Sequence, residues 1–255
     1  MSKTNLSECE MEKKVLCVIP ARGGSKGIKL KNLRVVCGET LLAHAVKTAL
    51  ACPEISKTVV STDHDEIALA AEDCGIEMFF RRPRNLSGDI VGDFDVLLNA
   101  LNEAEAHFEV KFDIILMLQP TSPLRTPEDV KKAIECLIAN EYDSVWTISE
   151  TDSKYHPLKQ LRLNESGTFD YFDPNSKNIV ARQQLYSLFH RNGVVYAFTR
   201  DCLVNQKSIK GKKSGALLID GHHVSIDTEE DIELIENLVR LGKIREGVLF
   251  AGSNS

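Results

Sequence analysis

The chain has 255 residues, 31 lysines and arginines against 37 aspartates and glutamates, a net charge of −6, and 43% hydrophobic residues. A chain of this length can bury a full hydrophobic core without disulfides or a structural metal, and it suits one large domain or one domain with an appendage. The negative net charge argues against nucleic acids and anionic membranes as partners, because both recruit proteins by long-range attraction to a polyanion. An anionic small molecule would therefore have to be bound by a local cluster of cations.

The N-terminal segment, residues 1–13, predicts a disordered tail, because it is polar, carries charges of both signs and lacks the apolar core of a secretory signal. The longest aliphatic run, Ile114–Leu118, is far too short to span a membrane. The seven cysteines are scattered, with neither a Cys-x-x-Cys pair nor a zinc-ligand spacing. We therefore expect a cytoplasmic protein with reduced thiols and no membrane partner.

From residue 14 onward, short apolar runs alternate with helical patterns. Val15–Ile19, ended by Pro20, predicts a strand buried on both faces, and Leu41–Leu50 carries an apolar stripe at helical spacing. Thr58–Ser61 predicts a second strand. Asp63, together with Glu66, predicts the cap of a helix, and the inner face of that helix is expected to be Ile67, Ala70, Ala71 and Cys74.

The alternation continues to residue 150. Ile76–Phe80 and Ile114–Leu118 predict further strands, and the segment Asp93–Phe108 between them is amphipathic. Thr126, followed by Pro127 and Asp129, predicts a capped helix start. Strands that alternate with helices at this spacing predict an α/β fold, a Rossmann-like three-layer sandwich with a mostly parallel sheet and helices on both faces.

The pattern changes between residues 151 and 186, where polar, glycine- and proline-containing pieces replace the helical periodicity. We interpret this segment as a small arm outside the main sheet, inserted between two parts of one domain, residues 14–150 and 187–245. In the second part, Val194–Phe198 predicts a strand, and Thr228 predicts the cap of a helix with Ile232, Ile235, Leu238 and Val239 on its inner face.

The loop after the first predicted strand carries the strongest chemical signal, because it combines glycines with cations where α/β sheets bind nucleotides. Between Ala21 and Gly38 there is no acid, and the cations are Arg22, Lys26, Lys29, Lys31 and Arg34. Glycines let backbone N–H groups approach phosphate oxygens, and the cations neutralise the phosphates, so the loop predicts a polyphosphate site. It has neither the P-loop spacing nor the dinucleotide-fold spacing. The alternative is a solvated basic turn.

The sequence resembles the acylneuraminate cytidylyltransferases, or CMP-sialic acid synthetases, which belong to the CMP-sugar synthetases. The resemblance covers roughly Val15–Val239 and rests on the loop and on collinear motifs: Ser61-Thr62-Asp63, Arg82-Pro83, Leu118–Arg125, His156–Lys159, Arg182–Leu185, Asn192-Gly193 and Ser225–Thr228. It implies that CTP and a nine-carbon 2-keto sugar acid, with Mg²⁺, give the CMP-sugar and pyrophosphate. It also implies a nucleotide-binding α/β sandwich and a homodimer joined through the arm.

The resemblance assigns the nucleotide site. Arg22 and Lys31 match cations that stabilise the leaving pyrophosphate, which makes them catalytic candidates, and Lys26 could share this role. Lys29 and Arg34 are expected to be solvated. Arg82 matches a nucleotide-contacting arginine, with a plain surface arginine as the alternative. The other nucleotide-binding candidates are Gly23, Ser25, Asn32 and Asp89, the last of which could instead cap the following helix.

The sugar site is assigned in the same way. Gln119, directly after a predicted strand, offers a donor and an acceptor to the sugar, or else bonds its own loop. Lys159 and Arg182, in the arm, match residues that reach the partner's site and bind the sugar carboxylate, and Arg182 matches the family's catalytic arginine. Tyr196 matches an aromatic residue of the sugar pocket, with a place in the core as the alternative. Arg125 could contact the loop rather than the ligand.

For Mg²⁺, Asp227 matches the second acid of an Asp-x-Asp pair in relatives, and Ser225 stands where those relatives have the first acid. Asp227 could instead merely precede the helix at Thr228. No residue is singled out as a general base. Three alternatives stay open: another keto sugar acid as substrate (legionaminic, pseudaminic or Kdo), a non-catalytic nucleotide-binding protein, and a different set of metal ligands.

Overall fold

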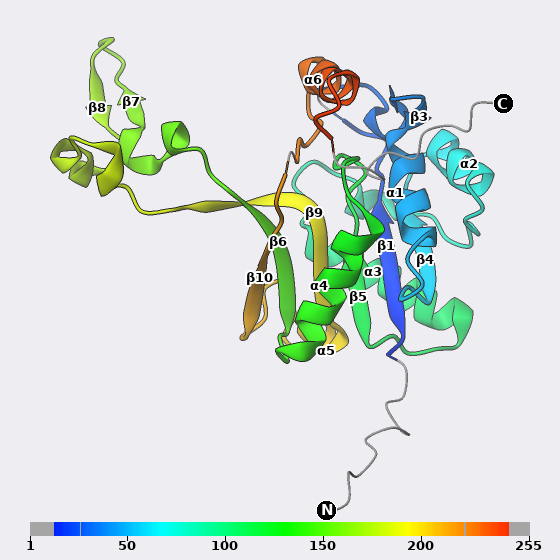
Figure 1. The fold of residues 1–255 in the computed structure, drawn as a ribbon. Coiled ribbons are helices and arrows are strands. Elements are labelled where there is room, and N and C mark those ends of the chain that lie inside the picture. Colours follow the sequence, from blue (N-terminus) through cyan, green and yellow to red (C-terminus); the bar gives the residue numbers. More distant parts are fainter. Residues whose placement is uncertain (1–12, 26, 222, 245–255) are drawn as a thin grey trace, which may run out of the picture.

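The computed structural model describes residues 13–25, 27–221 and 223–244. The predicted tail, apart from Lys13, lies outside these residues, as do Lys26 and Cys9. Within them, a six-stranded sheet has the order β10-β6-β9-β5-β1-β4 (Figure 1). Its strands are β1 (Val15–Pro20), β4 (Lys57–Ser61), β5 (Ile114–Met117), β6 (Ser144–Glu150), β9 (Phe189–Thr199) and β10 (Ser214–Leu218).

The sheet is mostly parallel, because β9 pairs antiparallel with both β5 and β6 while the other pairings are parallel. Its main helices are α1 (Leu41–Leu50), α2 (Asp65–Asp73), α3 (Asp93–Phe108), α4 (Pro127–Ala139), α5 (Arg200–Val204) and α6 (Glu229–Arg240). Side chains of α1, α2 and α4 share one buried cluster with the sheet, whereas those of α3 and α5 share another. The predicted α/β sandwich with helices on both faces is therefore confirmed.

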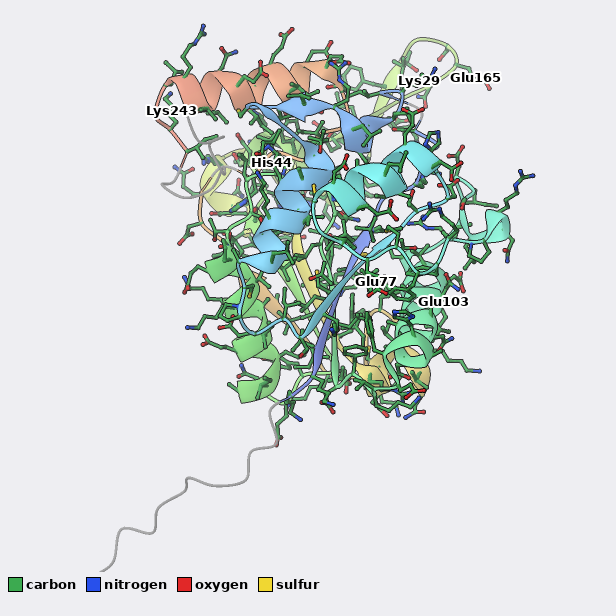
Figure 2. All side chains as sticks on the ribbon, turned by 90° about the vertical axis from the view of Figure 1, so that its right-hand side faces the viewer. Lys29, His44, Glu77, Glu103, Glu165 and Lys243 are labelled. Carbon is green, nitrogen blue, oxygen red and sulfur yellow. The ribbon has the colours of Figure 1, made fainter. Side chains whose placement is uncertain are left out.

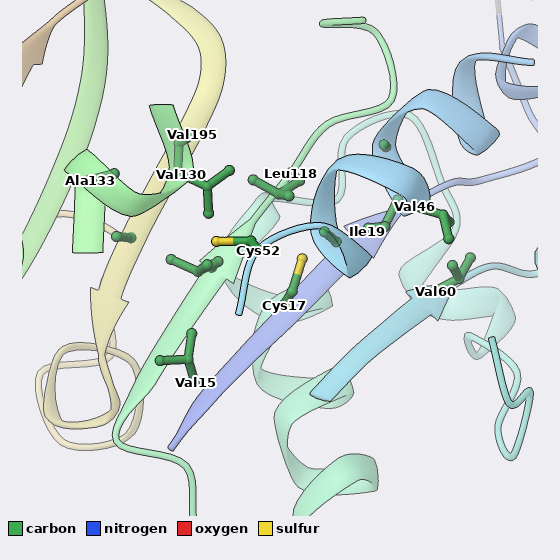
Figure 3. Close-up of a cluster of buried hydrophobic side chains, with 14 of the residues drawn as sticks. Val15, Cys17, Ile19, Val46, Cys52, Val60, Leu118, Val130, Ala133 and Val195 are labelled. Atoms are coloured by element: carbon green, nitrogen blue, oxygen red, sulfur yellow. The ribbon is translucent and has the colours of Figure 1, made fainter. Parts of the chain in front are cut away.

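Strand β1 has apolar residues at successive positions, without alternating polar ones, because both of its faces are covered. Val15, Cys17 and Ile19 belong to the cluster with α1, α2 and α4, shown in close-up in Figure 3. Leu16 and Val18 belong to the cluster on the opposite face. A central strand covered on both faces needs apolar residues at every position, which is what the sequence predicted.

The predicted bounds of α1 and α3 and the predicted caps of α4 and α6 agree with the structure. Helices α1 and α3 have the predicted bounds. Thr126 at the start of α4 and Thr228 at the start of α6 each form a capping box with the acid three residues later. In α6, Ile232, Ile235 and Leu238 are buried as predicted, but Val239 is 39% exposed.

Two predictions around α2 are wrong. The segment Ile76–Phe80 is extended but forms no strand, since β4 is the edge strand of the sheet and this segment does not pair with it. Asp63 does not cap α2, because the N-cap position is His64, which makes no capping side-chain bond. The Asp63 carboxylate instead accepts a hydrogen bond from the N–H of Gly23, at 2.8 Å.

The chain leaves the sheet after β6 and returns with β9, and the segment between them extends away from the body (Figure 1). It holds a small hairpin of β7 (Leu161–Leu163) and β8 (Phe169–Tyr171). Short 3-10 helices surround the hairpin: η3 (Ser153–Tyr155), η4 (Pro157–Lys159), η5 (Pro174–Asn178) and η6 (Arg182–Gln184). Many apolar side chains of this arm are exposed. They are Tyr155, Leu161, Leu163, Phe169, Tyr171, Phe172, Val180 and Tyr186.

A second hairpin, β2 (Val35–Val36) with β3 (Glu39–Thr40), connects the first loop to α1. His44, labelled on α1 in Figure 2, is buried, and its Nε2 lies 2.8 Å from the carbonyl oxygen of Val36. This contact fixes the hairpin against the body and so anchors one end of the loop. Among the described residues, no helix is long and apolar enough to cross a membrane.

Candidate active site

A cavity of about 430 Å³ lies at the carboxyl ends of the parallel strands β1 and β5. Its wall combines segments far apart in the sequence. They are six residues of the first loop (Pro20, Arg22, Gly24, Ser25, Lys31 and Asn32), seven residues from Arg82 to Val96 (Arg82, Leu86, Gly88, Asp89, Val91, Asp93 and Val96), Gln119 to Thr121, and the residues before α6 (Ser225 and Asp227). This edge is where open α/β sheets bind their ligands, because the loops that follow neighbouring parallel strands meet there.

The glycine-rich loop is held in shape by neighbours that leave no room for a side chain at Gly23 or Gly27. A Cβ added to Gly23 would lie 2.7 Å from Cδ2 of His64, and one added to Gly27 would lie 2.4 Å from the carbonyl oxygen of Asp227. The side chain of Asn32, which is buried, donates to the carbonyl oxygen of Arg22 at 3.0 Å. Gly23 and Asn32 therefore shape the loop, and Asn32 also lines the cavity together with Gly24 and Ser25.

Two of the predicted phosphate-binding cations form ion pairs across the cavity. The guanidinium of Arg22 lies 2.8 Å from a carboxylate oxygen of Asp89, and the Nζ of Lys31 lies 2.8 Å from one of Asp227. All four residues line the cavity. Arg34, expected to be solvated, is exposed and pairs with Glu229 at 2.6 Å, outside the cavity lining. The loop therefore brings Arg22 and Lys31 to one cavity, as the sequence predicted. In this structure their partners are the carboxylates of Asp89 and Asp227.

Arg82 is buried beneath the cavity and is not a surface arginine. It donates to the hydroxyl of Ser61 at 3.0 Å and to the carbonyl oxygen of Ser61 at 2.6 Å. Burial lowers the pKa of its guanidinium to about 10, although the nearby Asp63 carboxylate opposes this effect. At neutral pH Arg82 is still a cation, with its position fixed by the end of β4.

Gln119 lies at the cavity wall, on a loop that Arg125 holds in place. Arg125 is fully buried and donates to the carbonyl oxygen of Gln119 at 2.7 Å and to that of Gly193 at 3.3 Å. A Cβ added to Gly193, whose φ is +73°, would lie 3.0 Å from Oε1 of Gln119. Arg125 therefore contacts the loop, as the sequence analysis allowed, and sets the position of Gln119.

Tyr196 does not line the cavity. It is 6% exposed, belongs to the buried cluster under α3, and its ring meets that of Trp146 edge to face at 5.8 Å. Its neighbours on β9 pair with β5 and β6, which places this part of the strand inside the sheet. This position corresponds to the core alternative.

Lys159 and Arg182 lie in the arm, within η4 and η6, and neither lines the central cavity of its own chain. Arg182 lines a separate cavity of about 390 Å³ in the arm, together with Asp152, His156 and Tyr186. Within one chain, the structure therefore does not bring these two residues to the nucleotide site.

Asp93, which sequence reasoning did not select, also lines the cavity as the first residue of α3. Burial raises the pKa of its carboxyl, an effect opposed by the positive charges of Arg191 and Arg82. From the sequence, an acid in the first turn of a helix looks like an ordinary favourable partner of the helix dipole, so no signal distinguished it.

Three carboxylates thus face one cavity, and they give the site the donors that Mg²⁺ prefers. Asp227 is the most accessible, with 73% of its side chain exposed, and Asp89 follows with 45%. Among the described residues, no group of three or more histidines, cysteines or acids lies close enough to hold a metal by itself. The residues present therefore fit a Mg²⁺ ion held by one or two carboxylates together with phosphate oxygens and water.

Comparisons with known proteins place these features in a family. A family model described as "Cytidylyltransferase" matches residues 16–252. The chain is 32% identical, over 89% of its length and 95% of the relative's, to a CMP-N,N'-diacetyllegionaminic acid synthase of Campylobacter jejuni. It is 27% identical to an N-acylneuraminate cytidylyltransferase of Escherichia coli, over 88% of its own length and 52% of the relative's.

Among solved structures, a CMP:2-keto-3-deoxy-manno-octonic acid synthetase complexed with CTP superimposes with a TM-score of 0.65. The match covers 90% of this chain and 100% of that one, at 19% sequence identity. At this identity the comparison shows the fold, and the fold agrees with the sandwich described above.

Proposed function

The chain belongs to the cytidylyltransferase family, and from this premise we propose that it transfers CMP from CTP to the anomeric 2-hydroxyl of a nonulosonate, a nine-carbon 2-keto sugar acid. The observation that carries the proposal is the cavity at the end of β1 and β5. Arg22 and Lys31 of the glycine-rich loop line this cavity together with Gln119, at the edge of the sheet where α/β folds bind nucleotides.

The reaction is an in-line displacement at the α-phosphorus of CTP. The sugar hydroxyl gives up its proton to solvent as its oxygen forms a new bond to that phosphorus. The bond from the α-phosphorus to the oxygen of the β-phosphate breaks, so that pyrophosphate leaves. Negative charge grows on the leaving group as the bond breaks. Arg22 and Lys31 stabilise that charge, and preorganised cations of this kind supply a large part of the catalysis in such reactions.

Mg²⁺, when bound, would neutralise phosphate charge and orient the triphosphate. Asp227 would hold it, with Asp89, which pairs with Arg22 and lines the same cavity, as a second carboxylate. Ser225, which lines the same cavity, can supply only a weaker hydroxyl ligand. The chain's own contribution is to keep the Asp227 segment in place, through the hydrogen bond of 2.8 Å from the N–H of Ile226 to the carbonyl oxygen of Thr121.

We assign Lys159 and Arg182 to the site of a second copy of the chain. The arm that carries them is rich in exposed aromatic and aliphatic side chains, which a partner would cover. In such a homodimer, the arm of one subunit would bring two cations to the carboxylate of the sugar bound by the other, and Gln119 would meet its hydroxyl or N-acyl groups.

The sugar itself is the finer part of the proposal. The legionaminic acid synthase is more similar to this chain than the N-acylneuraminate enzyme, at 32% against 27% identity, and it matches over nearly its full length. We therefore place N,N'-diacetyllegionaminic acid ahead of N-acetylneuraminic acid, which the sequence motifs favoured.

The test is pyrophosphate release with CTP and Mg²⁺ held constant and the sugar varied among N,N'-diacetyllegionaminic, pseudaminic, N-acetylneuraminic and 3-deoxy-manno-octulosonic acids. We expect release that requires CTP, Mg²⁺ and a nonulosonate together, with the highest kcat/KM for the legionaminic acid. Release with none of the four sugars, in the presence of demonstrable CTP binding, would favour a non-catalytic nucleotide-binding protein.

A further inference from the structure

The cavity is rich in charge but balanced. Its described lining carries three cations, Arg22, Lys31 and Arg82, and three carboxylates, Asp89, Asp93 and Asp227. Binding a triphosphate, which carries about four negative charges, requires cations that are available to it. The Lys31–Asp227 pair, at 2.8 Å, occupies one of these cations with the carboxylate that suits a metal ion.

The two partners of this pair have contrasting environments. The Lys31 side chain is 16% exposed, whereas that of Asp227 is 73% exposed. The backbone of Asp227 is fixed against the glycine-rich loop, since its carbonyl oxygen lies where a side chain of Gly27 would be. The N–H of Asp227 also donates to the carboxylate of Asp231 at 2.9 Å. The pair is therefore positioned by the fold, and the Asp227 side chain is its more exposed member.

We propose that the Lys31–Asp227 ion pair makes the site selective for the magnesium–nucleotide complex over the free nucleotide. This inference rests on the proposed function. To reach Lys31, free CTP has to displace the Asp227 carboxylate. That carboxylate then faces the phosphates with no cation between them. The magnesium complex gives each member of the pair a new partner, because Lys31 meets phosphate oxygens and Asp227 meets the cation. Nucleotide and metal therefore bind with positive coupling, which is reciprocal.

The expected size of the effect follows from the exposure of the pair. Partly exposed ion pairs contribute up to about 1 kcal/mol, which corresponds to about a fivefold change in a binding constant. Removing the carboxylate also removes its repulsion of the phosphates. Asp227→Asn should therefore tighten the binding of CTP without metal by about three- to tenfold, although the substitution removes a proposed metal ligand.

The chain offers a matched control two residues away. Glu229 forms an ion pair of 2.6 Å with Arg34, and neither residue lines the cavity. Like Asp227→Asn, Glu229→Gln removes one negative charge near the start of α6 and breaks an ion pair with the glycine-rich loop, here with Arg34. It frees no cation that lines the cavity. Lys31→Met supplies a background in which Asp227 has lost this partner.

The experiment measures the Kd of CTP by calorimetry for the whole protein, first with EDTA and then with Mg²⁺. We expect Asp227→Asn to bind CTP in EDTA at least threefold more tightly than the unaltered chain, and to gain less from Mg²⁺. Glu229→Gln should stay within twofold of the unaltered chain under both conditions. The gain from Asp227→Asn should shrink in the Lys31→Met background. Thermal unfolding of each variant confirms that it is folded.

Equal or weaker binding of metal-free CTP by Asp227→Asn would overturn the inference, as would an equal gain from Glu229→Gln or an undiminished gain in the Lys31→Met background. An unaltered chain that fails to bind CTP even with Mg²⁺ would overturn the proposed function as well. The two failures are therefore distinguishable.

Discussion

Gly23 shows how one residue can set the geometry of the cavity. Its N–H donates to Asp63, and its Cα faces the ring of His64, so the loop is held against the N-terminal end of α2 from two sides. The sequence assigned Gly23 to nucleotide binding and Asp63 to a helix cap. The contacts assign both residues to the shape of the loop that presents Arg22.

Gly23→Ala should weaken the binding of the magnesium–CTP complex by about tenfold. Its Cβ would lie 2.7 to 2.9 Å from three atoms of His64, and relieving an overpacked contact of this kind typically costs about 1–3 kcal/mol. Calorimetric titration measures the loss. Gly92→Ala is the control, since a Cβ there meets nothing within 4 Å and Gly92 does not line the cavity.

A second substitution tests the cause of that loss. His64→Gly removes all three clashing atoms and leaves a residue that helix N-caps accept. The double variant Gly23→Ala, His64→Gly should recover most of the affinity. A double variant as weak as Gly23→Ala alone would show that the clash with His64 is not the reason.

At the scale of elements, Glu105 joins α3 to two other parts of the fold. It is buried, and it accepts hydrogen bonds from Arg200 of α5, from Lys111 and from the N–H of Phe112. Burial raises the pKa of its carboxyl, but these hydrogen bonds outweigh burial and lower the pKa to about 2, from an ordinary value of 4.5. The ionised carboxylate of Glu105 is therefore more stable in the folded protein than in the unfolded chain.

The free energy of unfolding should depend on pH through this group. Because the pKa is lower in the folded state, the stabilisation is complete above about pH 4.5 and is lost as the pH falls toward about 2. Glu105→Gln should lower the free energy of unfolding by about 2 kcal/mol at pH 7, and by much less at pH 2.5. Urea unfolding at both values measures the difference.

Glu103, on the same helix but exposed, gives the control for this prediction (Figure 2). Glu103→Gln should change the free energy of unfolding by less than about 0.5 kcal/mol, as surface substitutions usually do. The assigned pKa would be contradicted if Glu105→Gln lowered the free energy of unfolding by the same amount at both pH values.

At the scale of the whole molecule, the arm separates residues that the proposed reaction needs together. Arg22 and Lys31 line the cavity in the body, whereas Arg182 lies in a segment that extends away from it (Figure 1). If the arm serves a second copy, each complete site combines the body of one subunit with the arm of the other.

Mixing two inactive variants tests this arrangement. Arg22→Ala should lose most of the turnover at saturating CTP, since one oxyanion-stabilising donor is worth about a hundredfold or more. Arg182→Ala should lose it because the sugar carboxylate loses a charge-assisted partner that orients it. Unfolding and refolding an equal mixture should restore about a quarter of the activity, because half of the dimers are mixed and each mixed dimer has one intact site. The control mixture, Arg22→Ala with Lys31→Ala, should restore none, because both changes lie in the body.

Two results would contradict this prediction. An Arg22→Ala variant with near-normal turnover at saturating CTP would remove Arg22 from the mechanism. A mixture of Arg22→Ala and Arg182→Ala that regains no activity, although both variants form dimers, would place Arg182 outside the partner's site.

Local signals in the sequence determined most of the fold. Apolar runs without alternation predicted the buried strands β1 and β5, and the threonine caps at residues 126 and 228 predicted the starts of α4 and α6. These signals work because strand burial and helix capping depend on residues close together in the chain. The same local reasoning failed at Ile76–Phe80, since pairing with a strand depends on what lies beside it.

The sequence by itself determined the class of fold and the position of the cationic loop. Only the tertiary structure decided what those cations do, because their partners come from elsewhere in the chain: Asp89 for Arg22, Asp227 for Lys31 and Glu229 for Arg34. Counted along the sequence, residues 21 to 38 carry five positive charges and no negative one. Charges interact through space and not along the chain, so among the described residues the cations that line the cavity lie beside as many carboxylates.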